Sequence, residues 1–223
     1  VDVNDLKNFF LRWYGPNNAT VTIGGDINAA STIKLAEKYF GSIPRGPEVS
    51  KTVLPPVNLE SNRYVSYTDN YARIPVLSKT FPTVPNYHPD MPALACLAQV
   101  IGQGKNSILY QQLVKTQKAA ASSAFSRLSE LSGEFSLQVT PLPGTSLGAA
   151  DSLIYNAVEV FEKRGVTDDD IAKFKAGIES QYINGLQSVS GKVSQLAAFQ
   201  TFTGDANMIG KLLKQYQAVT KEA

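Results

Sequence analysis

The stretch FFLRWYGPNNATVTIGGDI, residues 9–27, decides how this chain is organised. Its first residues complete an apolar helical face and predict a helix over 3–14. A Gly-Pro-Asn-Asn loop follows, and Ala19 to Ile23 alternate in polarity with β-branched residues, which predicts a strand. A Gly-Gly-Asp turn then leads into an amphipathic helix over 28–40. The N-terminal part of the chain is therefore expected to form a helix–strand–helix unit.

Beyond this unit the sequence predicts a linker and a second domain. Residues 47–61 are rich in proline and lack helical periodicity, which is typical of a linker. Strands are expected at 62–70, 73–82, 119–128 and 131–141, and helices at 90–102, 106–117, 146–163, 168–186, 189–202 and 206–217. Helices that flank a mostly antiparallel sheet form an α+β domain. The predicted organisation is therefore 1–46, the linker 47–61, and 62–223.

Composition and charge exclude several classes of protein. Apolar residues make up 43% and charged residues 18% of the 223 residues, so the chain is globular rather than disordered. No apolar run approaches the roughly 20 residues that are needed to cross a bilayer. The net charge of +2 is too balanced to indicate a nucleic-acid partner. We therefore expect neither a membrane span nor nucleic-acid binding.

The residues that most often carry chemistry are scarce. Cys96 is the single cysteine of the sequence, so no internal disulfide and no cysteine-based zinc site can form. It lies among apolar residues of a predicted helix, which favours a buried and inert thiol. His88 is the single histidine and lies in a predicted loop without metal-ligand partners at helical or finger spacing. Catalysis by this chain alone is therefore not expected.

Other motifs are better explained by structure than by chemistry. Residues 102–107, Gly-Gln-Gly-Lys-Asn-Ser, lack the glycine spacing of a phosphate loop and follow a predicted helix instead of a strand. The Gly-Gly-Asp turn at 24–26 lacks the third glycine of a dinucleotide turn. Asp168 to Asp170 stand where acids favour the start of a helix. The serine-rich stretch 122–132 lacks a base that could activate a nucleophile.

An ordered series of segments resembles the pitrilysin/insulysin family of zinc metallopeptidases, the insulinase-like and processing-peptidase-like proteins. The first segment is 10–27, with its aromatic residues, Pro-Asn-Asn-Ala and Gly-Asp. The second is 36–46, with Tyr-Phe-Gly and Ile-Pro. The third is 81–113, with Phe-Pro-Thr-Val-Pro, Tyr-His-Pro-Asp and Ser-Ile-Leu-Tyr-Gln-Gln-Leu. The match covers nearly the whole chain.

The resemblance implies a fold and a metal that this chain does not bind itself. The family consists of repeated α+β domains of the processing-peptidase type, which are arranged as two halves of a clamshell. Its zinc is held by a His-x-x-Glu-His helix, which is absent from this sequence. The zinc ligands would therefore lie upstream of Val1. Residues 1–46 would close the preceding domain, and 62–223 would form most of the following one.

The resemblance also implies that the substrate-binding groups of the family are missing here. The family uses an arginine and a tyrosine in a Leu-Arg-x-Lys-x-x-x-Gly-Tyr-like stretch after a helix. In this chain Val114 stands at the arginine position and Ala121 at the tyrosine position. Neither side chain can bind a peptide carbonyl or stabilise an oxyanion. We therefore expect no catalytic, metal-binding or substrate-binding residue in this chain.

Two functions remain open at this stage. The first is a non-catalytic part of a zinc-dependent metalloendopeptidase, which shapes the peptide chamber and mates with the other half. The alternative is a structural or interaction subunit of the same family without peptidase activity. The expected partners are the peptide substrate of the parent protein, a second half or subunit, and a homodimer of this chain. The compartment stays open, with the periplasm or cell envelope favoured, and no signal peptide is present in the sequence.

Two structural expectations follow from the patterns. Leu94, Leu97, Ala98 and Ile101 recur at the spacing of one helix face and are expected to pack on the strands at 62–82. The strand at 19–25 lacks its native sheet, so we expect it to join the strands at 62–82 and 119–141. It would do so within one chain or by exchange between two chains.

Overall fold

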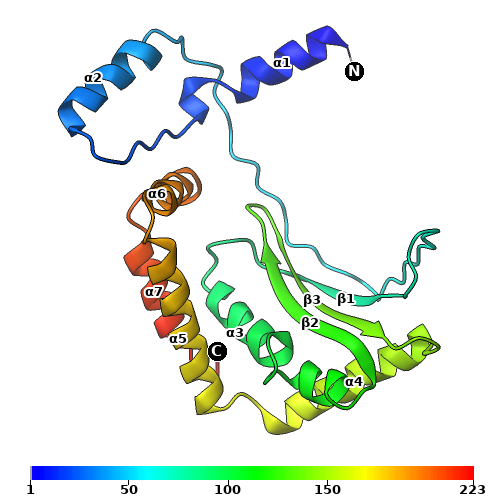
Figure 1. The fold of residues 1–223 in the computed structure, drawn as a ribbon. Coiled ribbons are helices and arrows are strands. Elements are labelled where there is room, and N and C mark those ends of the chain that lie inside the picture. Colours follow the sequence, from blue (N-terminus) through cyan, green and yellow to red (C-terminus); the bar gives the residue numbers. More distant parts are fainter. Residues whose placement is uncertain (1) are drawn as a thin grey trace. The chain divides into compact units, whose positions relative to one another are not determined.

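The computed structural model describes residues 2–223, which fold into helices and one small sheet (Figure 1). The helices are α1 (Val3–Trp13), α2 (Ala29–Phe40), α3 (Met91–Gly102), α4 (Leu147–Arg164), α5 (Asp168–Gly185), α6 (Val189–Thr203) and α7 (Ile209–Gln217). The strands are β1 (Leu77–Thr83), β2 (Ala119–Leu128) and β3 (Gly133–Pro141). A 3₁₀ turn, η1 (Pro16–Asn18), and a π-helical turn, η2 (Tyr110–Val114), complete the list.

The chain divides into two compact units. The first contains the residues up to 53 together with 179–213, and the second contains 54–178 and 214–223. The first unit includes α1, α2 and α6, and the second includes the sheet with α3 and α4. None of the helices within residues 2–223 is long and apolar enough to cross a membrane.

The sheet is antiparallel with the strand order β1-β3-β2. The hairpin of β2 and β3 closes through a bond from the Ser129 N–H to the Ser132 carbonyl, 2.8 Å long. β3 lies in the centre, where its apolar side chains Phe135, Leu137 and Val139 are buried. The predicted α+β class, an antiparallel sheet flanked by helices, is confirmed.

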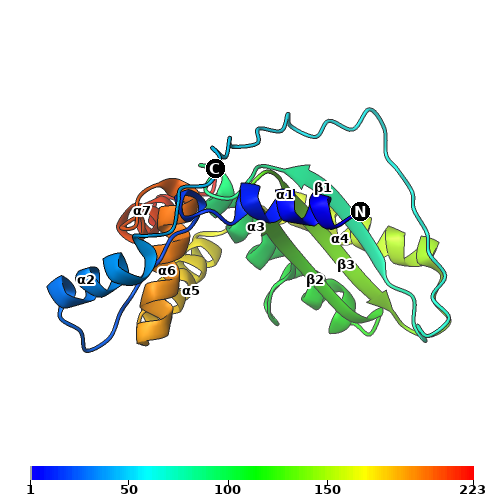
Figure 2. The ribbon, with the colours of Figure 1, turned by 90° about the horizontal axis from the view of Figure 1, so that it is seen from above.

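Both helices of the second unit that touch the sheet cover the same face (Figure 2). Lys79, Leu137 and Ala124 stand opposite one another on β1, β3 and β2, so their side chains share one face. α3 reaches that face at Ala124, against which Gly102 packs backbone to backbone. α4 reaches it at Lys79, whose Nζ lies 2.6 Å from a carboxylate oxygen of Asp151.

Three strand predictions are wrong. No strand forms at 19–23 or at 62–70, and the sheet does not include 19–25. Residues 19–24 run as a drawn-out chain between η1 and α2 (Figure 1), and Ala19 has extended backbone angles. A strand needs a neighbour that satisfies its backbone groups, and within residues 2–223 no strand pairs with either segment. The strand predicted at 73–82 begins later, at Leu77.

The helix predicted at 106–117 is shorter and partly π-helical. It is helical from residue 108 and widens at 110–114, where the Lys115 N–H donates to the Tyr110 carbonyl five residues earlier, at 2.9 Å. Gln117 follows with a positive φ of 56°, a conformation that stops a helix and costs energy for a residue other than glycine. The chain can thereby turn sharply into β2.

The face predicted for α3 is partly wrong. Ala98 and Ile101 are buried, at 1% and 6% exposure, but Leu94 and Leu97 are half-buried. The two leucines border an open hollow of about 530 Å³ beside the C-terminal residues 218–223. The helix packs mainly on β2 and to a lesser extent on β3, and no strand forms at 62–70.

The start of α5 supplies a pH-dependent contribution to stability. Burial alone would raise the pKa of Asp170, but the Thr167 N–H, the Arg164 guanidinium and the Thr167 hydroxyl stabilise the carboxylate and lower its pKa. A lowered pKa in the folded state stabilises the protein above the unfolded value of about 3.9, and this stability is lost as the pH falls through the folded pKa.

We therefore predict that Asp170→Asn destabilises the protein at pH 7 by about 1 kcal/mol, the usual worth of a helix cap. The difference in unfolding free energy between Asp170→Asn and the unchanged protein should become smaller when urea unfolding is repeated at pH 3. Asp169→Asn, at a neighbouring surface carboxylate, is the control and should change the unfolding free energy by less than about 0.5 kcal/mol. A difference that is equal at both pH values would contradict the assignment.

Candidate functional site

The face of the sheet turned away from α3 and α4 is strongly polar, and we call it the open face. Its rows are given by the register, because residues directly opposite one another share a face. One row contains Ser78, Gln138 and Ser123, and the next contains Thr80, Ser136 and Phe125. Open-face hydroxyls bond across strands, since the Thr80 and Ser136 oxygens lie 2.9 Å apart. Exposure along this face is uneven, since Thr80 is exposed whereas Ser136 is buried.

The end of the open face carries a charged pair. Arg127 on β2 stands opposite Glu134 on β3, and their side chains are bonded at 3.2 Å. The Arg127 guanidinium also lies 5.1 Å from the centre of the Phe125 ring. These groups can donate to and accept from a polypeptide backbone. Such groups suit the binding of a polar ligand.

The structure places the two substituted family positions at one end of β2. Ala121 precedes Ser122 in the strand and lies exposed on the open face, opposite Thr140. Val114 is the last residue of η2 and is half-buried. A methyl and an isopropyl group offer no hydrogen bond at these positions. That neither residue binds substrate stays a prediction.

His88 is held by its neighbours in the loop before α3. Its Nδ1 accepts the Asp90 N–H at 3.2 Å and lies 3.6 Å from the Asp90 carboxylate. Across residues 2–223 the structure contains no group of three or more His, Cys, Asp or Glu side chains that could hold a metal ion.

Cys96 is buried in α3, at 3% exposure. Burial, with a smaller effect of the Asp170 charge and an opposing one from Lys175, raises the pKa of its thiol to about 11. Because the thiolate is the reactive form, we predict that the folded protein does not react with the thiol reagent DTNB at pH 8. One equivalent should react after unfolding in urea. Rapid labelling of the folded protein would contradict the burial.

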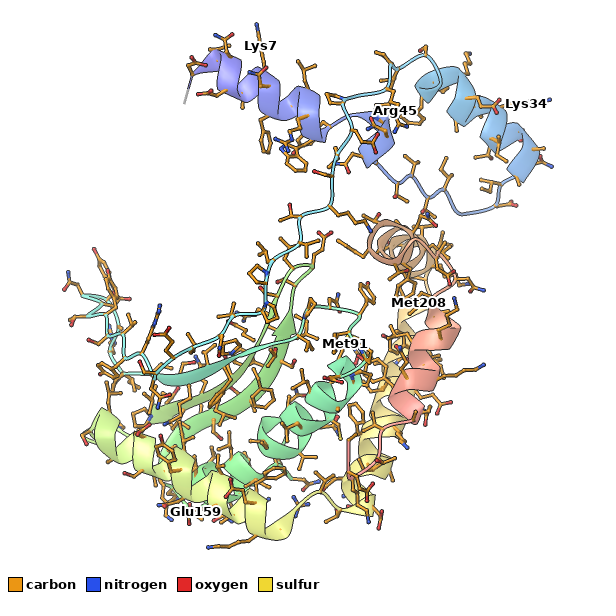
Figure 3. The ribbon with its side chains drawn as sticks, turned by 180° about the vertical axis from the view of Figure 1, so that it is seen from behind. Lys7, Lys34, Arg45, Met91, Glu159 and Met208 are labelled. Carbon is orange, nitrogen blue, oxygen red and sulfur yellow. The ribbon has the colours of Figure 1, made fainter. Side chains whose placement is uncertain are left out.

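The first unit contains a second candidate surface, an apolar hollow of about 580 Å³. Along the extended segment, residues 19–24, the apolar side chains of Ala19, Val21 and Ile23 line the hollow. The remaining lining residues come from α2 and the flanking loops: Tyr14, Pro16, Ile27, Ala29, Thr32, Ile33, Ala36, Phe40 and Ile43. The Thr32 hydroxyl donates to the Asn28 carbonyl, so the hollow presents an apolar lining. Figure 3 shows Lys7 and Lys34 extending outward from α1 and α2.

Sequence reasoning missed the role of the two asparagines beside this hollow. The Asn17 side-chain amide accepts the Gly46 N–H at 2.8 Å and donates to the Pro47 carbonyl at 2.9 Å. The Asn18 amide donates to the Trp13 carbonyl at the end of α1. The Pro-Asn-Asn motif therefore connects the loop after α1 to residues 46–47 by side-chain hydrogen bonds. A pair of consecutive asparagines after a helix was the available signal.

Comparisons with known proteins agree on one family. A family model described as "Peptidase M16 inactive domain" matches residues 1–178. The "Zinc protease PqqE" of Helicobacter pylori is 29% identical over 84% of this chain and 43% of its own length. A protease structure from the same organism has a TM-score of 0.79 at 20% identity, covering all of this chain and 54% of that one.

A second solved structure, the peptidase M16 inactive domain from Pseudomonas fluorescens, also has a TM-score of 0.79. It is 19% identical and covers all of this chain and 52% of that chain. At these identities the structures support the shared fold. The chain spans about half the length of the relatives it matches.

Proposed function

Since the chain belongs to the Peptidase M16 inactive-domain family, we propose that it is the non-catalytic part of a larger zinc-dependent metalloendopeptidase. In this proposal it shapes the chamber that receives the peptide and mates with the half that carries the metal. The zinc is held by that other half. The resemblance seen in the sequence is thereby confirmed at the level of the family.

The observation that carries the proposal is the polar open face. The helices α3 and α4 cover the other face of the sheet, so the sheet does not use its open face for its own core. The hydroxyl and amide groups of residues such as Thr80, Ser123 and Gln138 can form hydrogen bonds with an extended peptide that lies along this polar face. The charged pair of Arg127 and Glu134 lies at one end of the open face.

The apolar hollow supports the mating part of the proposal. Val21 and Ile23 are 62% and 48% exposed although their side chains are apolar. Residues 19–24 have no strand beside them within residues 2–223, so their backbone groups can pair with the edge of another sheet. We propose that residues 1–46 close an upstream domain in this way, and that 62–223 form most of the next domain.

This assignment predicts that the chain alone binds no zinc tightly and hydrolyses no peptide. Metal analysis of protein purified without chelator should find far less than one zinc per chain. A quenched fluorescent peptide should stay intact. Stoichiometric zinc together with activity that His88→Ala abolishes would overturn the prediction.

The proposal is tested by adding the polypeptide of the same genome that carries a His-x-x-Glu-His helix. A complex should form on size-exclusion chromatography, and hydrolysis of the quenched peptide should exceed that of either chain alone. Val21→Asp should prevent the complex, because a charge in the hollow is costly to bury. Lys34→Asp, on the outward side of α2, is the control and should leave the complex intact.

The results of this experiment distinguish between the two candidate functions, the non-catalytic part of a peptidase and the structural subunit. Ser123→Trp should lower kcat/KM of the complex without weakening its assembly, because Ser123 lies on the open face. A complex that forms but hydrolyses nothing would support the alternative, a structural or interaction subunit. Failure of any complex to form would contradict the mating proposal.

A further inference from the structure

Helix α6 contacts the extended segment along one row of side chains. Val189, Val193, Ala197 and Thr201 follow one another at a spacing of four and therefore lie on one side of the helix. We call this row the α6 stripe. Near its end, the Thr201 and Thr20 hydroxyls are hydrogen-bonded, with their oxygens 2.9 Å apart. Near its beginning, a Cβ on Gly24 would lie 2.5 Å from Val193 Cγ1.

The distance between the two contact points is about the same along the segment as along the helix, so the segment lies alongside α6. From Thr20 to Gly24 an extended chain covers about 13 Å at roughly 3.3 Å per residue. From Val193 to Thr201 a helix covers about 12 Å at roughly 1.5 Å per residue. The two run in opposite directions, because Gly24 meets the start of the stripe and Thr20 meets its end.

The contact also explains an inverted burial pattern in the extended segment. Thr22 is half-buried, whereas its apolar neighbours Val21 and Ile23 are exposed. Side chains alternate between two sides of an extended chain, so the even-numbered residues turn toward α6 and the odd-numbered ones line the hollow. The side of the segment toward α6 thus needs small or hydroxyl-bearing residues, such as Gly24 and Thr20.

α6 is itself held firmly at its beginning. Gly191 lies so close to the end of α5 that a Cβ there would come within 2.0 Å of the Gly185 carbonyl oxygen. The Ser188 hydroxyl caps the helix by accepting the Gly191 N–H at 2.9 Å. A helix that is fixed in this way can hold a segment that has no sheet partner.

From these contacts we propose that the α6 stripe is a docking surface for the extended segment and couples residues 2–46 to α6. The docked partner is an extended backbone with a glycine opposite Val193 and a hydroxyl opposite Thr201. This inference goes beyond the proposed function, because it concerns contacts within this chain and requires no second polypeptide.

A disulfide tests the docking directly. The Cβ at position 24 would lie 4.0 Å from Val193 Cβ, within the range of about 3.5–4.5 Å that a disulfide requires. In a Cys96→Ala background, Gly24→Cys with Val193→Cys should give an intramolecular cross-link under mild oxidation. Gly24→Cys with Lys192→Cys is the matched control, because residue 192 points about 100° away around the helix. The control should stay reduced.

A second measurement tests the coupling and does not depend on oxidation. Val193→Asp should raise the rate of trypsin cleavage at Lys34 and Lys38 in α2 about tenfold, because loss of docking increases local opening. Lys192→Asp should leave that rate unchanged. Equal cross-linking of both cysteine pairs, no cross-link at 24–193 in a folded protein, or equal cleavage of both aspartate variants would overturn the proposal. Assembly with a zinc-bearing half plays no part in either readout.

Discussion

Replacing Gly102 with alanine should destabilise the protein by about 3 kcal/mol or more in a urea titration. A Cβ at this position would lie 2.0 Å from the Ala124 nitrogen and 2.6 Å from the Ser123 carbonyl carbon. These are backbone atoms of β2, which cannot move aside without disturbing the sheet. Helix α3 would therefore have to shift away from the strand against which it packs.

The matched control is Gly177→Ala, which should have the opposite sign. Gly177 is exposed in the interior of α5, and a Cβ there would meet nothing within 4 Å. Alanine favours a helix over glycine by about 0.8–1.0 kcal/mol, so this variant should be more stable. A Gly102→Ala protein with unchanged stability would mean that α3 does not approach β2 as closely as described.

Phe174→Ala should cost about 3–5 kcal/mol, the usual loss for a buried phenylalanine. Phe174 is 1% exposed, and its ring lies 6.0 Å from the Tyr216 ring, between α5 and α7. Removing the ring leaves a cavity and ends the aromatic contact. Thermal unfolding followed by circular dichroism at 222 nm, together with urea titration, measures the loss.

Ile183→Ala on the same helix is the control for the loss of an apolar side chain. Ile183 is 55% exposed, so its truncation should change the unfolding free energy by less than about 1 kcal/mol. Similar losses for the two variants would show that Phe174 does not form a core contact.

The sequence allowed good prediction of elements whose signals are local. The sequence predicts strands at 119–128 and 131–141, and the turn between β2 and β3 is closed by a bond between Ser129 and Ser132, three residues apart. The start of α4 follows Ser146, whose hydroxyl accepts the Ala149 N–H. α6 likewise begins after Ser188. Such caps act between neighbours in the chain, so a single sequence is enough to recognise them.

Elements that depend on distant partners could not be predicted in this way. Residues 19–23 alternate as strands do and 62–70 were also predicted as a strand, but a local pattern does not reveal whether a second strand lies beside the segment. The open face depends on the register between β1, β3 and β2, and a shift of one residue would exchange its side chains for those under α3 and α4. Val114 and Ala121 were recognised as substituted positions from the resemblance to the family, because periodicity alone does not mark them.

The paired bonds of Asn17 turn residues 17–47 into a closed ring that contains α2. Closing a flexible ring of about 30 residues costs roughly 3 kcal/mol in chain entropy, whereas two such bonds contribute about 2 kcal/mol. These two bonds alone would leave the ring close to balance, so the contacts of Thr20 and Gly24 with α6 decide how often it opens as one cooperative unit. The amide hydrogens of α2 should accordingly exchange with solvent at a common rate, and a ligand or neighbour that covers the ring would slow them all together.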